Sequence, residues 1–323
     1  MINEVLNNIQ VTSFLGVMAA FTLTCLFIHL FYAKLPTDQG REFAHDGKLS
    51  AGKPRGAGFV FILVFIAVAV CFGNVNTENI IYLILVFAAM LTGFLDDCSK
   101  APWGEYKKGF LDLIIAIMIA ITMINFNGTD ISIVSLGVTV TLPPVVYGIL
   151  VVLLVWVSIN VTNCSDGVDG LSGTLTMITL MTIYIIMELL GTAGDFSYYI
   201  LLFVVCILGY LWFNATPSKL MMGDAGSRAM GLFIAIAILK TGSPILYIPV
   251  AIVLILDGGL GLVKVALLRF LKLHILKNTR TPLHDHVRKV KNWSNTQAVF
   301  RFAIIQIVVS IAVVYMVMIA TSK

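Results

Sequence analysis

Residues 145–171, VVYGILVVLLVWVSINVTNCSDGVDGL, pass directly from apolar to polar sequence. Residues 145–159 are almost all Val, Leu and Ile, and the apolar character returns over residues 174–190. Apolar runs of about this length span the hydrocarbon core of a bilayer. The polar segment 160–171 therefore joins two membrane helices, where Asn and Asp side chains are costly to desolvate. Turn chemistry alone could explain such a segment, so its meaning depends on the other polar segments of the chain.

The composition is that of a membrane protein. Of the 323 residues, 59% are hydrophobic and 12% are charged, and the mean hydropathy is +0.97. Soluble proteins carry about 25% charged residues. The five cysteines form no CxxC pair, which favours reduced core residues over a disulfide framework or a zinc site. The first apolar segment lacks a small-residue cleavage site, so we expect a retained anchor and one integral membrane domain over residues 1–323.

Ten apolar segments are long enough to cross the membrane. They are 11–33, 56–73, 78–95, 110–126, 143–160, 171–190, 196–213, 227–240, 244–270 and 297–319. Ten spans place both termini on the same side. Of the 21 Lys and Arg residues, only Lys240 and Lys323 fall toward the loops that follow even-numbered spans or toward the terminal side, so the positive-inside rule assigns the loops after odd-numbered spans to the cytoplasm. We therefore predict an all-α polytopic membrane protein with about ten transmembrane helices.

Two segments interrupt this helical pattern. Residues 127–142 alternate polar and β-branched residues, which predicts a short β-hairpin on the outer face. The ninth span contains Asp257, Gly258, Gly259 and Gly261, and glycine clusters are where helices kink. We predict a broken ninth helix, with residues 260–275 running as an amphipathic piece along the cytoplasmic boundary beside a lipid-binding groove. One long tilted helix is the alternative.

Polar residues gather on the five predicted cytoplasmic loops. In chain order these carry His45-Asp46-Gly47 with Lys53-Pro54-Arg55-Gly56; Asp96-Asp97 with Lys100, Lys107 and Lys108; Asn160, Asn163, Asp166 and Asp169; Asn214 with Gly223-Asp224-Ala225-Gly226-Ser227; and Thr281-Pro282-Leu283-His284-Asp285-His286. Because the five loops share one face, their side chains are available to a common site.

The chemistry of these loops indicates a metal and a phosphate. Adjacent carboxylates such as Asp96 and Asp97 are hard oxygen ligands that suit Mg²⁺, whereas a soft-metal site needs thiolates or several imidazoles. Lysines and the glycine-rich helix start at 223–227 favour anions. The chain has no GxxxxGK[ST] and no GxGxxG, which argues against an ATPase or a dinucleotide enzyme. Metal-assisted phosphoryl transfer fits best; a transporter is the alternative, but only Asp257 lies at midspan.

Four ordered motifs resemble those of the polyprenyl-phosphate N-acetylhexosamine 1-phosphate transferases. They are Asp96-Asp97 with Lys100, Asn163-x-x-Asp166-Gly167-x-Asp169-Gly170-Leu171, Asn214 through Met222-Gly223-Asp224-Ala225-Gly226-Ser227, and Pro282-x-His284-x-His286. The His45-Asp46-Gly47 loop and the histidine motif make the chain most similar to the phospho-N-acetylmuramoyl-pentapeptide transferase (MraY) branch. The resemblance implies ten helices, a homodimer in the bacterial inner membrane, Mg²⁺, UDP-MurNAc-pentapeptide as donor, undecaprenyl phosphate as acceptor, and lipid I plus UMP as products. It implies no nucleic-acid partner.

The resemblance and the loop chemistry together give an expected site on the cytoplasmic face. We expect Asp224 to bind Mg²⁺ with the donor pyrophosphate, and Asp96 and Asp97 either to deprotonate the acceptor phosphate or to help hold the metal. The substrate-binding residues are expected to be Lys53, Lys100, Lys108, Asn163, Asp166, Asn214 and His284, and His286 is expected to be needed for activity.

Three positions depart from the family pattern. The family's triple histidine is His284-Asp285-His286 here, and Met221 stands where this branch has an aromatic residue. Residues 52–58, GKPRGAG, lie between the GTPTMGG of this branch and the PRxGG of the GlcNAc-1-phosphate branch. A UDP-GlcNAc:undecaprenyl-phosphate GlcNAc-1-phosphate transferase is therefore the alternative enzyme.

Overall fold

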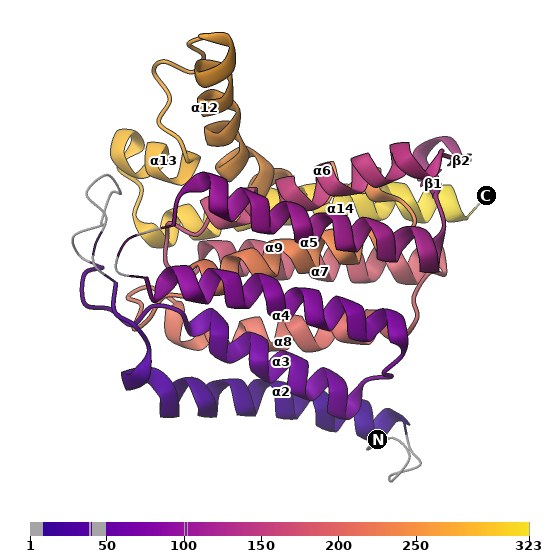
Figure 1. Ribbon diagram of the computed structural model, residues 1–323, viewed down its shortest axis with the longest axis horizontal. Helices are drawn as coiled ribbons and strands as arrows, with labels where there is room; N and C mark the ends of the chain where they lie inside the picture. Colours follow the sequence, from indigo (N-terminus) through magenta and orange to yellow (C-terminus); the bar gives the residue numbers. More distant parts are fainter. Residues whose placement is uncertain (1–8, 39, 41–49, 100, 102, 323) are drawn as a thin grey trace.

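The computed structural model describes residues 9–322 apart from residues 39, 41–49, 100 and 102. Long helices lie side by side in one bundle (Figure 1). Their bounds are α2 Ile9–Phe31, α3 Ala57–Phe72, α4 Thr77–Asp97, α5 Glu105–Asn127, α6 Pro144–Cys164, α7 Leu171–Leu190, α8 Asp195–Asn214, α9 Gly223–Lys240 and α14 Asn295–Thr321. A 3₁₀ turn, η1 (Tyr32–Lys34), extends α2.

Helix α9 forms the centre of the bundle. Every residue from Gly223 to Leu239 is buried, and the helix packs against α3, α4, α6, α7 and α8. Two glycines let its first turn approach neighbouring helices closely. A Cβ on Gly93 would lie 2.3 Å from the carbonyl oxygen of Asp224, and one on Gly58 would lie 2.0 Å from the backbone nitrogen of Gly226. The start of α9 is therefore wedged between α3 and α4.

Helices occupy all ten of the predicted segments, but fewer of them meet the requirements for a membrane span. Within the described residues, seven helices are long and apolar enough to cross a membrane, and a bent pair in the ninth segment raises this to eight. Helix α3 has only 16 residues. Helix α9 carries Asp224, Arg228 and Lys240 within 18 residues. The chain is a polytopic helical membrane protein, and the count of ten spans stays a prediction.

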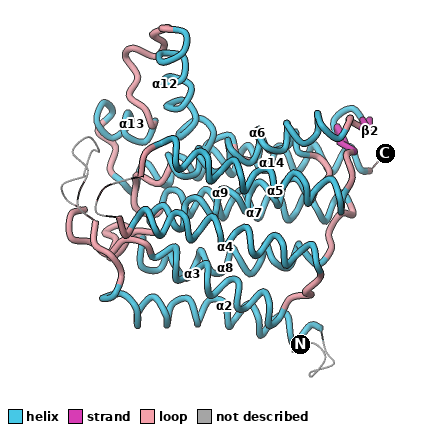
Figure 2. The backbone as a smooth tube through the Cα atoms, in the orientation of Figure 1, coloured by secondary structure: helices cyan, strands magenta, loops and turns pink. Residues whose placement is uncertain are grey.

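The two ends of the bundle differ in character. The start of α2, the end of α14 and a β-hairpin lie at one end (Figure 1). In the hairpin, β1 (Asp130–Ile133) pairs antiparallel with β2 (Val138–Thr141) around a 3₁₀ turn, η2 (Val134–Leu136). The loops that carry the polar motifs gather at the other end (Figure 2). The predicted hairpin and the shared side of the termini are thus confirmed.

The ninth segment is broken, as predicted, but the bend comes earlier than the glycine cluster. It comprises η3 (Pro244–Leu246), α10 (Tyr247–Val250), α11 (Ile252–Leu254), the π-turn η4 (Ile255–Gly259) and α12 (Leu260–Leu271). The chain bends by 70° after Val250. Gln306 of α14 accepts from the backbone nitrogen of Val253 at 3.1 Å and donates to the carbonyl of Val250 at 2.9 Å. This amide satisfies backbone groups that the break leaves without helical partners.

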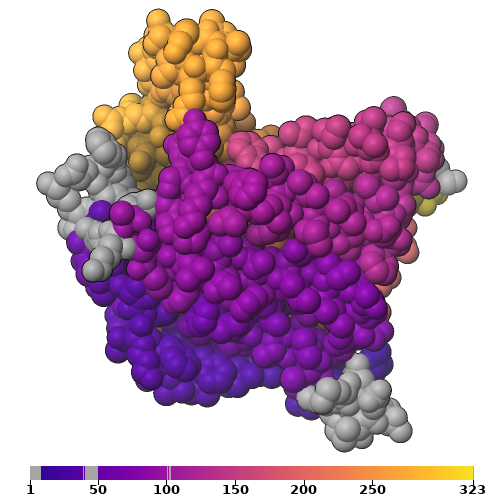
Figure 3. Space-filling model, in the orientation of Figure 1, coloured from indigo at the N-terminus to yellow at the C-terminus, as the bar shows by residue number. Residues whose placement is uncertain are grey.

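Helix α12 projects away from the bundle (Figures 1 and 3). It ends at Leu271, four residues before the predicted end of the amphipathic piece. Lys264 is half-buried, and its ammonium donates to the carbonyls of Leu276 and Thr279 at 3.0 and 2.9 Å. The lysine thereby holds the chain that leads to α13 (Leu283–Lys291).

Candidate active site

The start of α9 is held by Asp97, the last residue of α4. The Asp97 carboxylate accepts hydrogen bonds from the backbone nitrogens of Asp224 and Ala225, both at 3.1 Å. The first N–H groups of a helix have no partner within the helix, and their partial positive charge favours a carboxylate. Gly223 makes the contact possible, since its φ is +71° and a Cβ there would lie 2.2 Å from Asp97 Oδ2. Asp97 therefore fixes the position of Asp224.

Asp224 lies between two side-chain cations. Its Oδ1 accepts from Arg55 Nη2 at 3.1 Å, and its Oδ2 accepts from Lys108 Nζ at 2.8 Å. Arg55 also contacts Asp97, with 2.9 Å between Nε and Oδ1, and its Nη1 is 3.4 Å from Oδ1 of Asp38. The Asp224 side chain is only 9% exposed. The pair of cations thus compensates a carboxylate that is largely removed from water.

The pKa of Arg55 reflects this acidic surrounding. Burial acts to lower it, but Asp97, Asp224, Asp38 and Asp166 together raise it above its ordinary value. Asp166, in the turn after α6, is therefore an electrostatic neighbour of the same guanidinium. Arg55 therefore keeps its charge throughout the physiological pH range.

Asp96 and Lys108 form the second half of this cluster. Lys108 Nζ pairs with Asp96 Oδ2, and Asp96 Oδ1 accepts from the backbone nitrogen of Trp103 at 2.6 Å. The neighbouring Lys107 points elsewhere, with its Nζ 3.2 Å from the centre of the Trp103 ring. The structure thus separates two adjacent lysines, and Lys108 alone of the pair contacts the carboxylates.

Two asparagines from the predicted site have different surroundings. Asn163 donates to Ser227 Oγ at 2.9 Å, and Ser227 donates to the carbonyl of Gly223 at 3.1 Å, so Asn163 reaches the first turn of α9. Asn214 is buried, and its Oδ1 accepts from Gly170 N at 2.7 Å. Its Nδ2 donates to the carbonyl of Leu220 at 2.8 Å. Both ends of the Asn214 amide hold backbone, which favours a positioning role over substrate contact.

Lys53 also connects loops at this end of the bundle. Its Nζ donates to Ser218 Oγ at 3.1 Å and lies 3.7 Å from Asp169 Oδ2. The Lys53 side chain is 30% exposed, so it stays accessible at the rim of the site. Lys100 and the His45-Asp46-Gly47 segment lie outside the described residues, and their predicted contribution stays a prediction.

The histidine motif forms α13, which packs on the turn after α6. The backbone nitrogen of His284 donates to Asp257 Oδ1 at 2.7 Å, and His284 Nδ1 lies 2.8 Å from Oδ2 of the same carboxylate. Both residues are buried. A Cβ on Gly167 would lie 2.3 Å from His284 Nε2, so that glycine leaves the space for the imidazole. His286 is half-buried, and its Nδ1 accepts from the backbone nitrogen of Arg280 at 3.3 Å.

The cluster includes two residues that sequence reasoning did not assign to the site, Arg55 and Asp38. From that loop only Lys53 was predicted for the site, as a substrate-binding residue, and this stays a prediction; the contacts with Asp97 and Asp224 come from Arg55. No spacing rule connects residue 38 or 55 with residues 97 and 224. Their association arises only when the loop before α3 folds over the start of α9.

The carboxylates can be compared with the needs of a magnesium ion. Among the described residues, no three His, Cys, Asp or Glu side chains converge on one point suited to a metal. Mg²⁺, however, commonly uses one or two carboxylates and completes its shell with water and substrate phosphates. Asp97 and Asp224, which share the Arg55 guanidinium, supply hard oxygens of this kind. The residues fit a magnesium ion whose remaining ligands come from substrate.

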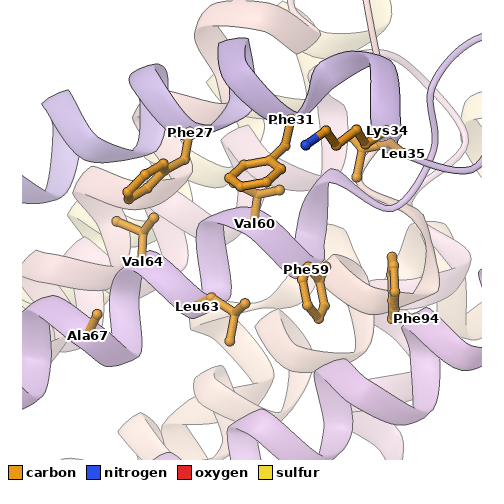
Figure 4. Close-up of a pocket in the computed structure, with 10 residues that line it drawn as sticks. All are labelled: Phe27, Phe31, Lys34, Leu35, Phe59, Val60, Leu63, Val64, Ala67 and Phe94. Atoms are coloured by element: carbon orange, nitrogen blue, oxygen red, sulfur yellow. The ribbon is translucent and has the colours of Figure 1, made fainter.

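An apolar groove opens beside this cluster, between α2, α3 and α4 (Figure 4). Its volume is about 520 Å³. The described lining residues are Phe27, Phe31, Lys34, Leu35, Phe59, Val60, Leu63, Val64, Ala67 and Phe94. Phe59 and Phe94 stack with ring centres 4.4 Å apart. Phe94 precedes Asp97 by about one helical turn, so the groove lies about one turn of α4 from the acidic cluster.

Comparisons with known proteins point in one direction. A family model described as glycosyl transferase family 4 matches residues 79–242. The phospho-N-acetylmuramoyl-pentapeptide-transferase of Treponema pallidum is 38% identical over 312 residues, covering 90% of this chain and 85% of the relative. The protein of the same name from Borreliella burgdorferi is 30% identical, covering 90% and 91%. That from Clostridium acetobutylicum is 26% identical, covering 83% and 87%.

Proposed function

Because the chain belongs to the phospho-N-acetylmuramoyl-pentapeptide transferase family, we propose that it transfers phospho-MurNAc-pentapeptide from UDP-MurNAc-pentapeptide to undecaprenyl phosphate, with Mg²⁺, giving lipid I and UMP. The family makes the chain a membrane glycosyl-1-phosphate transferase of peptidoglycan synthesis. We place its site on the cytoplasmic face of the bacterial inner membrane and expect a homodimer.

The observation that carries the proposal is the position of Asp224 between Arg55 and Lys108 at the start of α9. Transfer brings two phosphate groups together beside a low-dielectric membrane, where their repulsion is large. Two side-chain cations and a helix start supply positive charge at one point. A magnesium ion held by Asp224 and Asp97 would offset the remaining charge on the donor diphosphate.

In the proposed reaction, an oxygen of the acceptor phosphate attacks the β-phosphorus of the donor. One P–O bond forms, the bond from that phosphorus to the oxygen of UMP breaks, and UMP leaves with the bonding electrons. Lys108 and Arg55 are placed to stabilise the charge on the transferred and leaving phosphates. We assign Asn163 and Asp166, beside the first turn of α9, to the nucleoside or the sugar phosphate.

The contacts of Asp97 support direct attack over a phosphoryl-enzyme. Both of its oxygens accept backbone N–H groups of α9, and its side chain is fully buried. A nucleophilic carboxylate would have to give up these contacts to reach phosphorus. Positioning and charge stabilisation suffice for the one-step reaction. We therefore assign Asp97 to holding Asp224 and the metal, and Asp96 to orienting Lys108.

The acceptor needs apolar surface that leads to the site. We place part of its isoprenoid chain in the groove between α2, α3 and α4, because this groove ends about one turn from Asp97. Lys34, the charged residue among the described lining residues, is suited to a lipid phosphate at the mouth. The lipid groove expected beside residues 260–275 stays a prediction.

The size of the donor separates the proposed activity from that of a GlcNAc-1-phosphate transferase. A muramoyl-pentapeptide is much larger than GlcNAc and requires polar surface beyond the membrane. Helix α13 provides this surface. His286 is partly exposed on it, and His284 is anchored by Asp257. We assign His286 to the donor, and His284 to holding α13 against the turn after α6.

A side-by-side donor assay tests the proposed function. Purified protein with Mg²⁺ and undecaprenyl phosphate is expected to release UMP from UDP-MurNAc-pentapeptide and not from UDP-GlcNAc. His286→Ala should lose this activity, while Lys107→Ala, a change on the Trp103 ring, should keep it. Release of UMP from UDP-GlcNAc alone would assign the chain to the sister activity instead.

A further inference from the structure

Arg55 holds more of the acidic cluster than any other described side chain. Its guanidinium contacts Asp38, Asp97 and Asp224 within 3.4 Å. Its backbone is held on both sides. Before it, the peptide group between Pro54 and Arg55 donates to the carbonyl of Pro36 at 2.7 Å and accepts from Met221 N at 2.8 Å, and after it Ala57 N donates to the carbonyl of Met221 at 3.1 Å. The side chain can therefore move while its Cα stays in place.

Among the described residues, the charges in mutual contact at this cluster do not balance. The four carboxylates of Asp38, Asp96, Asp97 and Asp224 outnumber the two cations, Arg55 and Lys108. A divalent cation would neutralise the excess. Both oxygens of Asp224 already carry a side-chain cation, however, with Arg55 on Oδ1 and Lys108 on Oδ2. Each oxygen keeps a second lone pair, but a metal ion bound there would lie beside two side-chain cations, and its charge favours the departure of one of them.

Arg55 can leave without stripping any of these carboxylates of all its partners. When it moves, Asp97 keeps two backbone N–H donors and is not left unpaired. Asp224 keeps Lys108 and gains the metal. Asp38 can continue to hold one Nη of Arg55, so the rest of the guanidinium turns about that anchor. The released N–H groups form a planar fork, which matches two phosphate oxygens.

We propose that Arg55 is a diphosphate-binding residue, which pairs with Asp97 and Asp224 in the free enzyme and turns to the donor diphosphate when a divalent cation takes its place. The inference rests on the proposed function. It adds the prediction that substrate-free enzyme binds divalent cations weakly, because Arg55 pairs with the carboxylates that would bind them. Nucleotide and metal then bind cooperatively. The metal releases Arg55 to the diphosphate, and the diphosphate holds Arg55 away from the carboxylates that bind the metal.

Binding measurements on the purified full chain test this without turnover. Mn²⁺ binding is measured by electron paramagnetic resonance in the absence of nucleotide, and UDP binding by calorimetry with saturating Mg²⁺. Arg55→Gln is expected to bind Mn²⁺ about tenfold more tightly than wild type, and UDP about 10–100-fold more weakly, the loss expected for charge-assisted hydrogen bonds. Arg301→Gln, which removes a guanidinium stacked on Trp293, should change neither affinity.

Two results would overturn the inference. Unchanged UDP affinity in Arg55→Gln would show that Arg55 does not contact the diphosphate, and weaker Mn²⁺ binding would show that it supports the carboxylates without competing for them. If Arg55→Gln does not fold, Arg55→Lys takes its place; a single ammonium should bind UDP several-fold more weakly than wild type, and equal affinity would again contradict the inference. Failure of wild type to bind UDP would instead contradict the proposed function.

Discussion

Gly223 is the single residue on which the geometry of the acidic cluster depends most directly. Its positive φ turns the chain into α9, and its missing side chain admits the Asp97 carboxylate. Because Asp97 holds the backbone nitrogens of Asp224 and Ala225, the glycine sets the position of the carboxylate to which we assign the metal.

Gly223→Ala should therefore lose both stability and activity. Gly242 is a matched control, since its φ is also +71° and nothing lies within 4 Å of a Cβ placed there. Gly242→Ala should cost about 1–2 kcal/mol from backbone strain alone. Gly223→Ala adds a contact of 2.2 Å with Asp97, so thermal unfolding in detergent should show a larger drop, together with loss of UMP release. Equal effects of the two substitutions would argue against the role of Asp97.

The sequence predicts most of the acidic cluster at this scale. Carboxylates at helix ends beside a membrane are expensive, which singles out Asp96, Asp97 and Asp224, and the structure places Lys108 on two of these. Arg55 and Asp38 could not be predicted, because a guanidinium in a basic loop looks like an ordinary surface charge. The substrate role of Asn214 stays a prediction; its hydrogen bonds to the backbone of Gly170 and Leu220 could not be read from the sequence.

At the scale of elements, the ninth segment and α13 behave as one unit. The glycine cluster predicted a kink at residues 257–261, but Asp257, Gly258 and Gly259 belong to the π-turn η4, which packs against α6, where a Cβ on Gly258 would lie 2.2 Å from the carbonyl oxygen of Val161. The bend itself comes after Val250, where Gln306 satisfies the freed backbone groups. Gln306 lies 53 residues after Val253, so the sequence around the break gives no sign of this partner.

The buried pair of Asp257 with His284 joins α13 to that π-turn. Asp257→Ala leaves the His284 backbone nitrogen and ring nitrogen without their acceptor, which should cost about 1–3 kcal/mol for each buried group left unsatisfied. Hydrogen exchange over residues 283–291 should accelerate. His284→Ala added to Asp257→Ala should change little more, because the two residues act through one contact. Additive effects would show that each has a separate role.

Asp285→Ala serves as the control for that experiment. Its carboxylate is half-buried and lies 3.7 Å from Arg288, so its loss should leave exchange in α13 nearly unchanged. Acceleration equal to that of Asp257→Ala would mean that any charge change on α13 loosens it.

At the scale of the whole molecule, hydropathy predicts the helical segments in chain order and the end of the bundle at which each connecting loop lies. It does not settle how many cross the membrane, because α9 is buried by other helices and can carry charge. Arg228 of α9, for example, pairs with Asp112 of α5 at 2.5 Å. A buried helix need not match the length or composition of one that faces lipid.

Orientation is testable with cysteines at the two ends. Cys98 is exposed beside the acidic cluster, and Ser135 is exposed in the hairpin turn. With the remaining cysteines changed to Ser, an impermeant maleimide should label Cys98 only in inverted vesicles. A Ser135→Cys chain without Cys98 should be labelled only in spheroplasts. The opposite pattern would invert the predicted topology.

The claim that Asp224 holds the divalent cation with the donor diphosphate is tested most directly by UMP release from Asp224→Asn. Loss of the metal's charge stabilisation, worth several kcal/mol, should slow release by roughly a thousandfold while the protein stays folded. Asp130→Asn, an exposed hairpin carboxylate bonded to Thr141, should retain wild-type turnover. Wild-type rates from folded Asp224→Asn with Mg²⁺ would contradict the account.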